Sequence, residues 1–142
     1  MVNETGKQIE QQQLENGMEL LLYDRSRAIA GDRWQVELRC EVHIPVDESY
    51  WDMMDQEDTQ LLPDIRNILG DRLVFVTTKQ RNFIDAEERE TVLQEMVQQV
   101  YNSMLEYLKK PQFPQEFFKK QYRETLQKVQ LQQAIARAND KC

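Results

Sequence analysis

Three arginines and two small polar residues lie close together in the sequence, on either side of a predicted turn, and their chemistry suits an anionic ligand. The candidate ligand-binding set is Asp24, Arg25, Ser26, Arg27 and Arg33. Guanidinium groups held on rigid strands can donate two parallel hydrogen bonds to a phosphate or a carboxylate. The alternative is that these charges only pair with charges on the facing strand, such as Glu37 and Arg39.

An acidic and aromatic segment follows Pro45 and offers two further kinds of chemistry. Its carboxylates could hold a metal ion in an enzyme, although they lack the alternating spacing of a calcium-binding loop. Its apolar side chains and those of the last helix form a candidate partner-binding set, because Trp and Tyr anchor interfaces and Met adapts to irregular partners. The carboxylates are Asp47, Glu48, Asp52, Asp55, Glu57 and Asp58, and the partner-binding set is Tyr50, Trp51, Met53, Met54, Phe117, Phe118 and Tyr122. The aromatic segment could instead fold back over an open end of the sheet.

Known catalytic motifs are missing from the sequence. The single histidine, His43, falls on the polar phase of a strand, and there is no Ser-His-acid grouping, P-loop or G-x-G-x-x-G. Cys40 and Cys142 have no neighbouring His or Cys with which to bind zinc. We therefore predict no catalytic residue, no metal site and no cofactor, and we favour a protein that is not an enzyme.

Composition and charge narrow the class of protein. The chain has 142 residues, of which 40 % are hydrophobic and 30 % charged, as in a soluble globular domain. No apolar run approaches the ~20 residues of a membrane span, and residues 1–16 do not resemble a signal peptide. We therefore expect a cytoplasmic protein that does not contact a membrane.

The net charge of -7 is distributed unevenly. From Lys109 onward, eight basic residues outnumber three acidic ones, so this end carries +5 and the rest of the chain carries -12. A basic arm suits nucleic acid, but nucleic-acid-binding domains are usually basic overall. We therefore expect no nucleic acid, and an arm that lies against its own acidic body or against a neighbour's.

Residues 34–44 alternate between apolar and polar side chains without a break, which indicates a strand with one buried face. Residues 18–30 form its hairpin partner, with Gly31-Asp32 as the turn. With a two-residue turn at Gly31-Asp32, the pairing would bring two arginines into the core. A register shifted by one residue instead places Leu22 opposite Cys40, but it turns Ile29 outward. We predict a β-bulge within residues 23–27 that reconciles the two registers.

Three helices and one further strand complete the prediction. A short helix covers residues 59–70, and residues 73–79 form a strand buried on both faces, in the middle of a sheet. The main helix begins at Asp85, with Asp85 and Glu88 as a capping box, ends near Lys110, and lies across the sheet. The last helix spans about residues 114–138, and its narrow apolar stripe favours a partner.

The sequence therefore predicts a single α+β domain of order β-β-α-β-α-α. Its antiparallel or mixed sheet has about three strands, with helices on one face. Residues 16–138 form the domain, residues 1–15 a disordered tail, and residues 139–142 a second tail. The function that we favour is a protein-interaction or regulatory module that acts as a homo-oligomer or adaptor. A binder of a small phosphorylated or carboxylated ligand and a metal-dependent enzyme are the alternatives.

Overall fold

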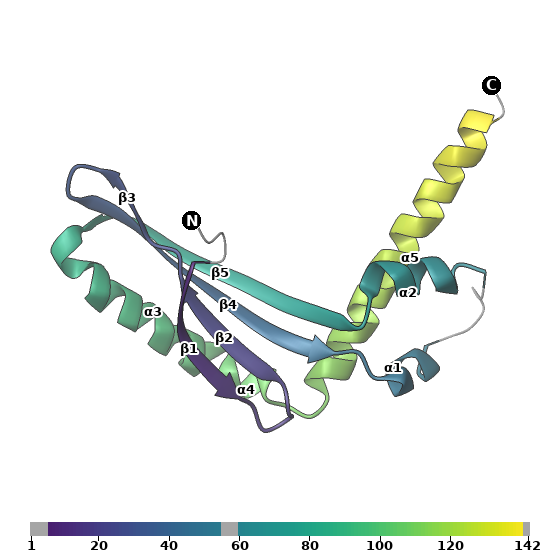
Figure 1. Ribbon diagram of the computed structural model, residues 1–142, viewed down its shortest axis with the longest axis horizontal. Helices are drawn as coiled ribbons and strands as arrows, with labels where there is room; N and C mark the ends of the chain where they lie inside the picture. The colour runs from purple at the N-terminus through teal and green to yellow at the C-terminus, as the bar shows by residue number, and fades with distance from the viewer. Residues whose placement is uncertain (1–5, 55–59, 141–142) are drawn as a thin grey trace. The chain divides into compact units, whose positions relative to one another are not determined.

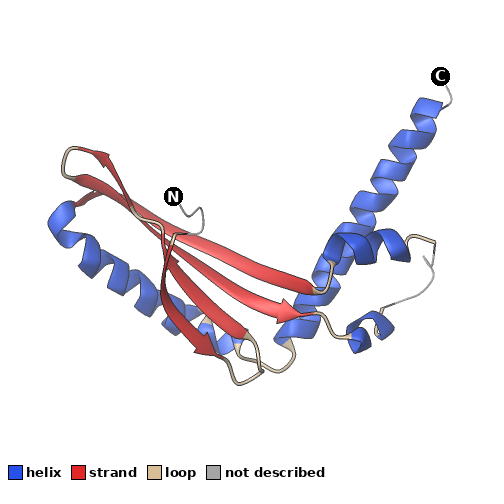
Figure 2. Ribbon diagram, in the orientation of Figure 1, coloured by secondary structure: helices blue, strands red, loops and turns tan. Residues whose placement is uncertain are grey.

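The computed structural model describes residues 6–54 and 60–140 and has a mixed α+β fold with one five-stranded antiparallel sheet (Figures 1 and 2). The strands are β1 (Lys7–Gln13), β2 (Glu19–Asp24), β3 (Arg27–Ala30), β4 (Arg33–Pro45) and β5 (Arg72–Asp85). The helices are α1 (Glu48–Asp52), α2 (Leu62–Leu69), the 3-10 turn η2 (Ala86–Glu88), α3 (Arg89–Ser103), α4 (Leu105–Leu108) and α5 (Phe113–Asp140). The α+β class is confirmed, and the sheet is larger than the three strands predicted.

Contacts divide the chain into two compact units, which we describe separately. The first unit comprises Met1–His43 and Val74–Phe113, and the second comprises Ile44–Leu73 and Pro114–Cys142. Strands β4 and β5 each run from one unit into the other.

Strand β4 is the centre of the sheet, as its alternating sequence predicts. It pairs with β2, β3 and β5, and β1 extends the sheet beyond β2. Val36, Leu38 and Val42 of its apolar phase are at most 1 % exposed. The expected strand with one buried face is therefore confirmed.

The hairpin adopts the shifted register. Leu22 lies opposite Cys40, and Ala28 lies opposite Trp34, so the register is the same on both sides of residues 25–26. The irregularity falls between Ala28 and Ala30, beside the turn. The bulge that we predicted within residues 23–27 is therefore wrong, and Ile29 is turned out to 44 % exposure.

Two local hydrogen bonds allow this register, which brings Asp24 and Ser26 onto the apolar phase. The Asp24 carboxylate accepts a hydrogen bond from the Ser26 backbone N–H at 2.9 Å, and the Ser26 hydroxyl accepts one from the Glu37 N–H at 3.1 Å. Each side chain therefore has a backbone partner, on its own strand segment for Asp24 and on the facing strand for Ser26, and no arginine has to enter the core.

Strand β1 corrects the prediction of a disordered tail over residues 1–15. Lys7–Gln13 pairs with β2, from Lys7 opposite Asp24 to Gln13 opposite Glu19, with an irregularity between Gln8 and Glu10. Apart from Ile9, its side chains are polar, and most are exposed, so the sequence shows no apolar alternation that would predict it. Residues 1–5 lie outside the described residues.

Strand β5 is longer than predicted and lies at an edge of the sheet. Within the described residues it pairs only with β4, and Val74 and Val76 are 39 % and 41 % exposed. The prediction of a central strand buried on both faces is therefore wrong. A run of β-branched residues indicates a strand, but burial depends on neighbours that the run does not specify.

In the first unit, α3 lies along one face of the sheet and buries Leu93, Met96 and Val100 (Figure 1). Its start is held where the Ala86 N–H donates a hydrogen bond to the Asp32 carbonyl at 2.8 Å. The predicted capping box is wrong, because Asp85 makes no side-chain cap and pairs with Arg33 instead. The main helix is also divided at Met104 into α3 and α4.

The end of α4 is held by Asn16, from the turn between β1 and β2. Its amide donates hydrogen bonds to the carbonyls of Leu108 and Lys110, at 2.8 and 2.9 Å. Leu108 is the last residue of α4, where carbonyls lack an intrahelical partner, whereas the Lys110 carbonyl also accepts a hydrogen bond from the Phe113 N–H at 3.1 Å. One side chain therefore attaches this segment to the sheet.

The second unit contains α1, α2 and α5. Its buried side chains include Trp51 of α1, Ile65 and Leu69 of α2, and Phe118 of α5. Helix α5 confirms the predicted last helix and continues to Asp140, so residues 139 and 140 belong to it and not to a tail. In the described ranges, no helix combines the length and apolar character that crossing a membrane requires.

Candidate functional site

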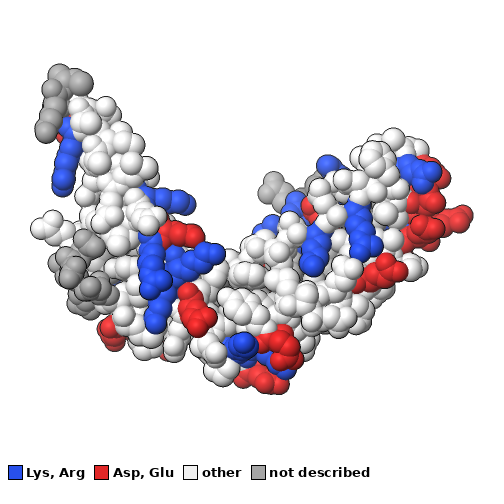
Figure 3. Space-filling model, turned by 180° about the vertical axis from the view of Figure 1, so that it is seen from behind, with Lys and Arg blue, Asp and Glu red and all other residues white. Residues whose placement is uncertain are grey.

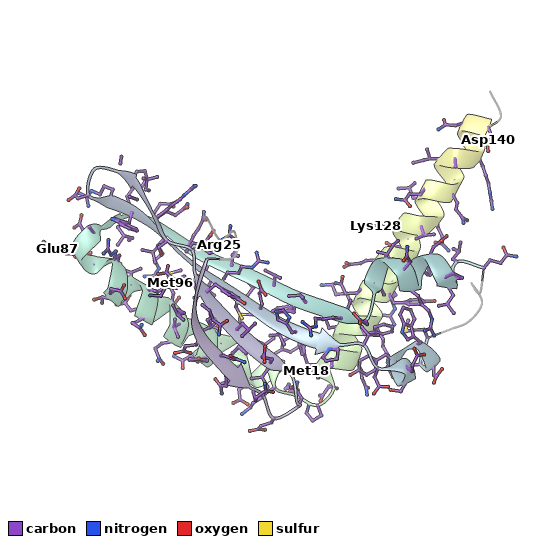
Figure 4. The ribbon with its side chains drawn as sticks, in the orientation of Figure 1. Met18, Arg25, Glu87, Met96, Lys128 and Asp140 are labelled. Atoms are coloured by element: carbon purple, nitrogen blue, oxygen red, sulfur yellow. The ribbon has the colours of Figure 1, made fainter. Side chains whose placement is uncertain are left out.

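The arginines of the predicted ligand-binding set do not converge on one site. The Arg25 guanidinium lies 3.3 Å from the Glu37 carboxylate, Arg27 donates to Gln35 at 3.0 Å, and Arg33 pairs with Asp85. Figure 4 places Arg25 at the junction of β2 and β3. Cross-strand pairing of Arg25 with Glu37 is the alternative that the sequence left open.

Asp24 and Ser26 line a small cavity with residues that the sequence analysis missed. The cavity has a volume of about 200 Å³, and its other lining residues are Trp34, Arg89, Glu90 and Leu93. The guanidinium carbon of Arg89 lies 4.3 Å from the centre of the Trp34 ring, as in a cation–π contact. Only the packing of α3 on the sheet brings these groups together, and no motif in the sequence marks them.

A second polar group lies on β4, on the phase that faces away from α3. The Glu41 carboxylate accepts hydrogen bonds from Arg39 Nε at 2.6 Å and from His43 Nε2 at 2.8 Å. A carboxylate can only accept, so Nε2 carries the proton. Burial by itself would raise the pKa of Glu41, but the hydrogen bonds from Arg39 and His43 lower the pKa overall.

Replacing Glu41 with glutamine is expected to lower the free energy of unfolding by about 1–3 kcal/mol at neutral pH, because a buried charge-assisted network is lost. A carboxyl whose pKa is lowered by folding stabilises the protein above its unfolded-state pKa, and this stabilisation disappears as the pH falls through the folded-state pKa. The difference between the variant and the original chain should therefore be largest at neutral pH and should shrink at an acidic pH below the usual pKa of a glutamate. Urea denaturation of both proteins at the two pH values measures this difference in the free energy of unfolding.

Glu48 provides the matched control, because its carboxylate is 78 % exposed and pairs with Arg66 at the surface. The substitution Glu48→Gln should change stability by less than about 1 kcal/mol at either pH. A loss for Glu41→Gln that is the same at both pH values would contradict a role for the ionised carboxylate.

Cys40, next to Glu41, is not suited to nucleophilic chemistry. Burial, and then the charge of Glu41, raise the pKa of the thiol to about 12. A reactive cysteine needs a lowered pKa and access to solvent. Cys40 is 1 % exposed and therefore serves as a core residue. Cys142 lies outside the described residues.

The aromatic part of the predicted partner-binding set forms a core cluster in the second unit. The Phe118 ring lies 4.9 Å from the Trp51 ring and 5.5 Å from the Tyr50 ring, measured between centroids. Trp51, Phe118 and Tyr122 are at most 6 % exposed. Their proposed partner contacts are therefore corrected to internal packing, which explains why large aromatics recur in α1 and α5. Met54 and Phe117 are half-buried, and Met53 is 39 % exposed.

The acidic segment has structural roles where it is described. Asp47 caps α1 by accepting a hydrogen bond from the Ser49 N–H at 2.9 Å, and Glu48 pairs with Arg66 at 3.1 Å. Among residues 6–54 and 60–140, no group of three or more His, Cys, Asp or Glu side chains could hold a metal ion. Asp55, Glu57 and Asp58 lie outside the described residues.

The distal part of α5 leaves large aliphatic side chains exposed. Val129 is the last buried residue of α5 in the described chain, whereas Leu131 and Ile135 are 61 % and 52 % exposed. Figure 4 labels Lys128 and Asp140, which bracket this part of the helix. Because successive helical residues are rotated by about 100°, Leu131 and Ile135 lie on a different side of α5 from Phe118 and Val129.

Comparison with known proteins does not assign the chain to a family: no protein-family model, no curated protein and no solved structure matches it.

Proposed function

We propose that this protein is a non-enzymatic interaction module that pairs with a second copy of itself through the distal part of α5. The observation that carries the proposal is the exposure of Leu131 and Ile135, at 61 % and 52 %, near the end of a 28-residue helix. Helical ends that bury no apolar face are marginal in water. With Ala134 between them, these residues make an apolar strip, which we call the distal strip, with helical spacing.

The charges favour a second copy as the occupant of this surface. Along α5, the basic residues Lys119, Lys120, Arg123 and Lys128 outnumber the acidic ones (Figure 3). The chain before Lys109 carries -12 and so attracts such a helix, whereas it would repel nucleic acid. Figure 3 also shows acidic side chains grouped in the first unit. A second copy of the chain therefore offers charge of the opposite sign. In a symmetric dimer, the basic helix of each copy can lie against the acidic part of the other copy.

Sedimentation equilibrium of the full chain tests the proposal. We expect a dimer at micromolar concentration that weakens with added salt, because part of the attraction is between exposed charges. The double substitution Leu131→Ser with Ile135→Ser should raise the dissociation constant at least about hundredfold, since four buried aliphatic side chains per dimer lose their contacts.

The matched control is Ile68→Ser. Ile68 is an aliphatic residue of α2 that is 58 % exposed, similar to Leu131 and Ile135, but it lies outside the distal strip. This variant should remain a dimer. A chain that stays monomeric up to about 0.5 mM, or an equal weakening by Ile68→Ser, would refute pairing through α5.

A further inference from the structure

We propose that the cavity between the β2–β3 junction and the start of α3 binds a small zwitterion, of the class of free apolar amino acids. Its lining combines two carboxylates, one guanidinium, a hydroxyl and two apolar surfaces, from Asp24, Glu90, Arg89, Ser26, Trp34 and Leu93. All six belong to the first unit. The proposal does not depend on pairing through α5.

The ionisable groups that line the cavity keep hydrogen-bonding capacity for a ligand. Among the described residues, Arg25, Arg33 and Arg39 each form an ion pair, whereas Arg89 and Glu90 form none within 4.0 Å. The Asp24 carboxylate accepts one backbone hydrogen bond, from Ser26, which leaves acceptor capacity on the carboxylate. Available charges of both signs around one cavity are the property that suggests a ligand with both signs.

The geometry of Arg89 suits the carboxylate of such a ligand. Its guanidinium is stacked over the Trp34 ring at 4.3 Å, and stacking uses the face of the group. The N–H donors at the edge of a stacked guanidinium stay available for two parallel hydrogen bonds to a carboxylate. Trp34 therefore orients Arg89 without occupying its donors.

The charge balance argues against ligands of a single sign. The lining carries two negative groups and one positive group, so an anion such as phosphate meets net repulsion. A simple cation would lie beside the positively charged Arg89 and would be repelled by it. An α-amino acid places its ammonium near Asp24 and Glu90, its carboxylate on Arg89 and its side chain against Leu93.

The size of the cavity limits the ligand further. A volume of about 200 Å³ lies below the roughly 300–1,000 Å³ of sites for drug-sized molecules. Nucleotides are too large for it, whereas a single amino acid fits. Asp24 and Ser26 are also held by hydrogen bonds to the backbone of their own hairpin, so the site is formed before a ligand arrives.

Isothermal titration of the full chain with L-valine, L-leucine and glycine tests this proposal. We expect L-valine or L-leucine to bind with a dissociation constant below about 1 mM. N-acetyl-L-leucine lacks the ammonium and L-leucinamide lacks the carboxylate, and each should bind at least about tenfold more weakly than L-leucine. No binding of any of the three amino acids up to about 10 mM would overturn the proposal, and so would equal binding of L-leucine and its two derivatives.

Substitutions distinguish a ligand bound in the cavity from a ligand bound by the arginines elsewhere on the hairpin. Asp24→Asn keeps an oxygen for the Ser26 N–H, and Arg89→Gln keeps a polar side chain over Trp34. Each should weaken binding at least about tenfold while the circular dichroism spectrum stays unchanged. Arg27→Gln is the control, because Arg27 is exposed and does not line the cavity, and it should leave binding unchanged. A loss with Arg27→Gln as large as that with Arg89→Gln would place the ligand elsewhere.

Discussion

Replacing Phe118 with alanine is expected to lower the free energy of unfolding by about 3–5 kcal/mol, the usual range for removing a buried aromatic side chain. Phe118 is 0 % exposed, and its ring contacts those of Tyr50, Trp51 and Tyr122. Tyr50 and Trp51 belong to α1, whereas Phe118 and Tyr122 belong to α5, so closing the resulting cavity would require one helix to move toward the other. Urea denaturation followed by tryptophan fluorescence measures the change, since Trp51 lies within the cluster.

The control is Phe83→Ala, which makes the same substitution at the protein surface. Its side chain is 74 % exposed, so Phe83→Ala removes little buried area and should change stability by less than about 1 kcal/mol. Similar losses for the two variants would show that the cluster around Phe118 is not a core of the second unit.

Leu22→Ala is expected to lower the free energy of unfolding by about 2–5 kcal/mol, because it opens a cavity beneath the centre of the sheet. Leu22 is 0 % exposed and lies opposite Cys40, which is 1 % exposed. Guanidinium denaturation, with the unfolding of the sheet followed by circular dichroism, measures the change.

The register of the hairpin is tested by comparison with Ile29→Ala. In the register that we observe, Ile29 is 44 % exposed, and its truncation should lower stability by less than about 1 kcal/mol. In the register set by a two-residue turn, Ile29 would face the core and Leu22 would face solvent, so the order of the two losses would be reversed. That reversal would contradict the observed pairing.

The two proposals use different parts of the predicted sites. From the predicted ligand-binding set, Asp24 and Ser26 line the cavity, but the arginine beside them is Arg89 of α3 and not one from the hairpin. From the predicted partner surface, Trp51, Phe118 and Tyr122 are core residues, and the exposed aliphatic residues lie further along α5. Residue type alone could not separate packed side chains from available ones.

Local periodicity determined the parts of the fold that depend on neighbours in the chain. The alternation over residues 34–44 predicted β4 and its buried face, and helical patterns predicted the last helix, α5, and a main helix that the structure divides into α3 and α4. The sequence also supplied both possible hairpin registers, because each follows from the length of the turn. These features need only the period of the strand or helix itself.

The tertiary structure alone decided which distant groups meet. Strand β1 shows no apolar alternation and exists through its pairing with β2, and β5 is an edge strand because within the described residues only β4 lies beside it. Asp85 pairs with Arg33 and leaves the helix start uncapped, which a local capping rule cannot anticipate. Burial and ion pairing depend on residues far away in the sequence, and for this reason the sequence determined the elements whereas packing decided their surfaces and sites.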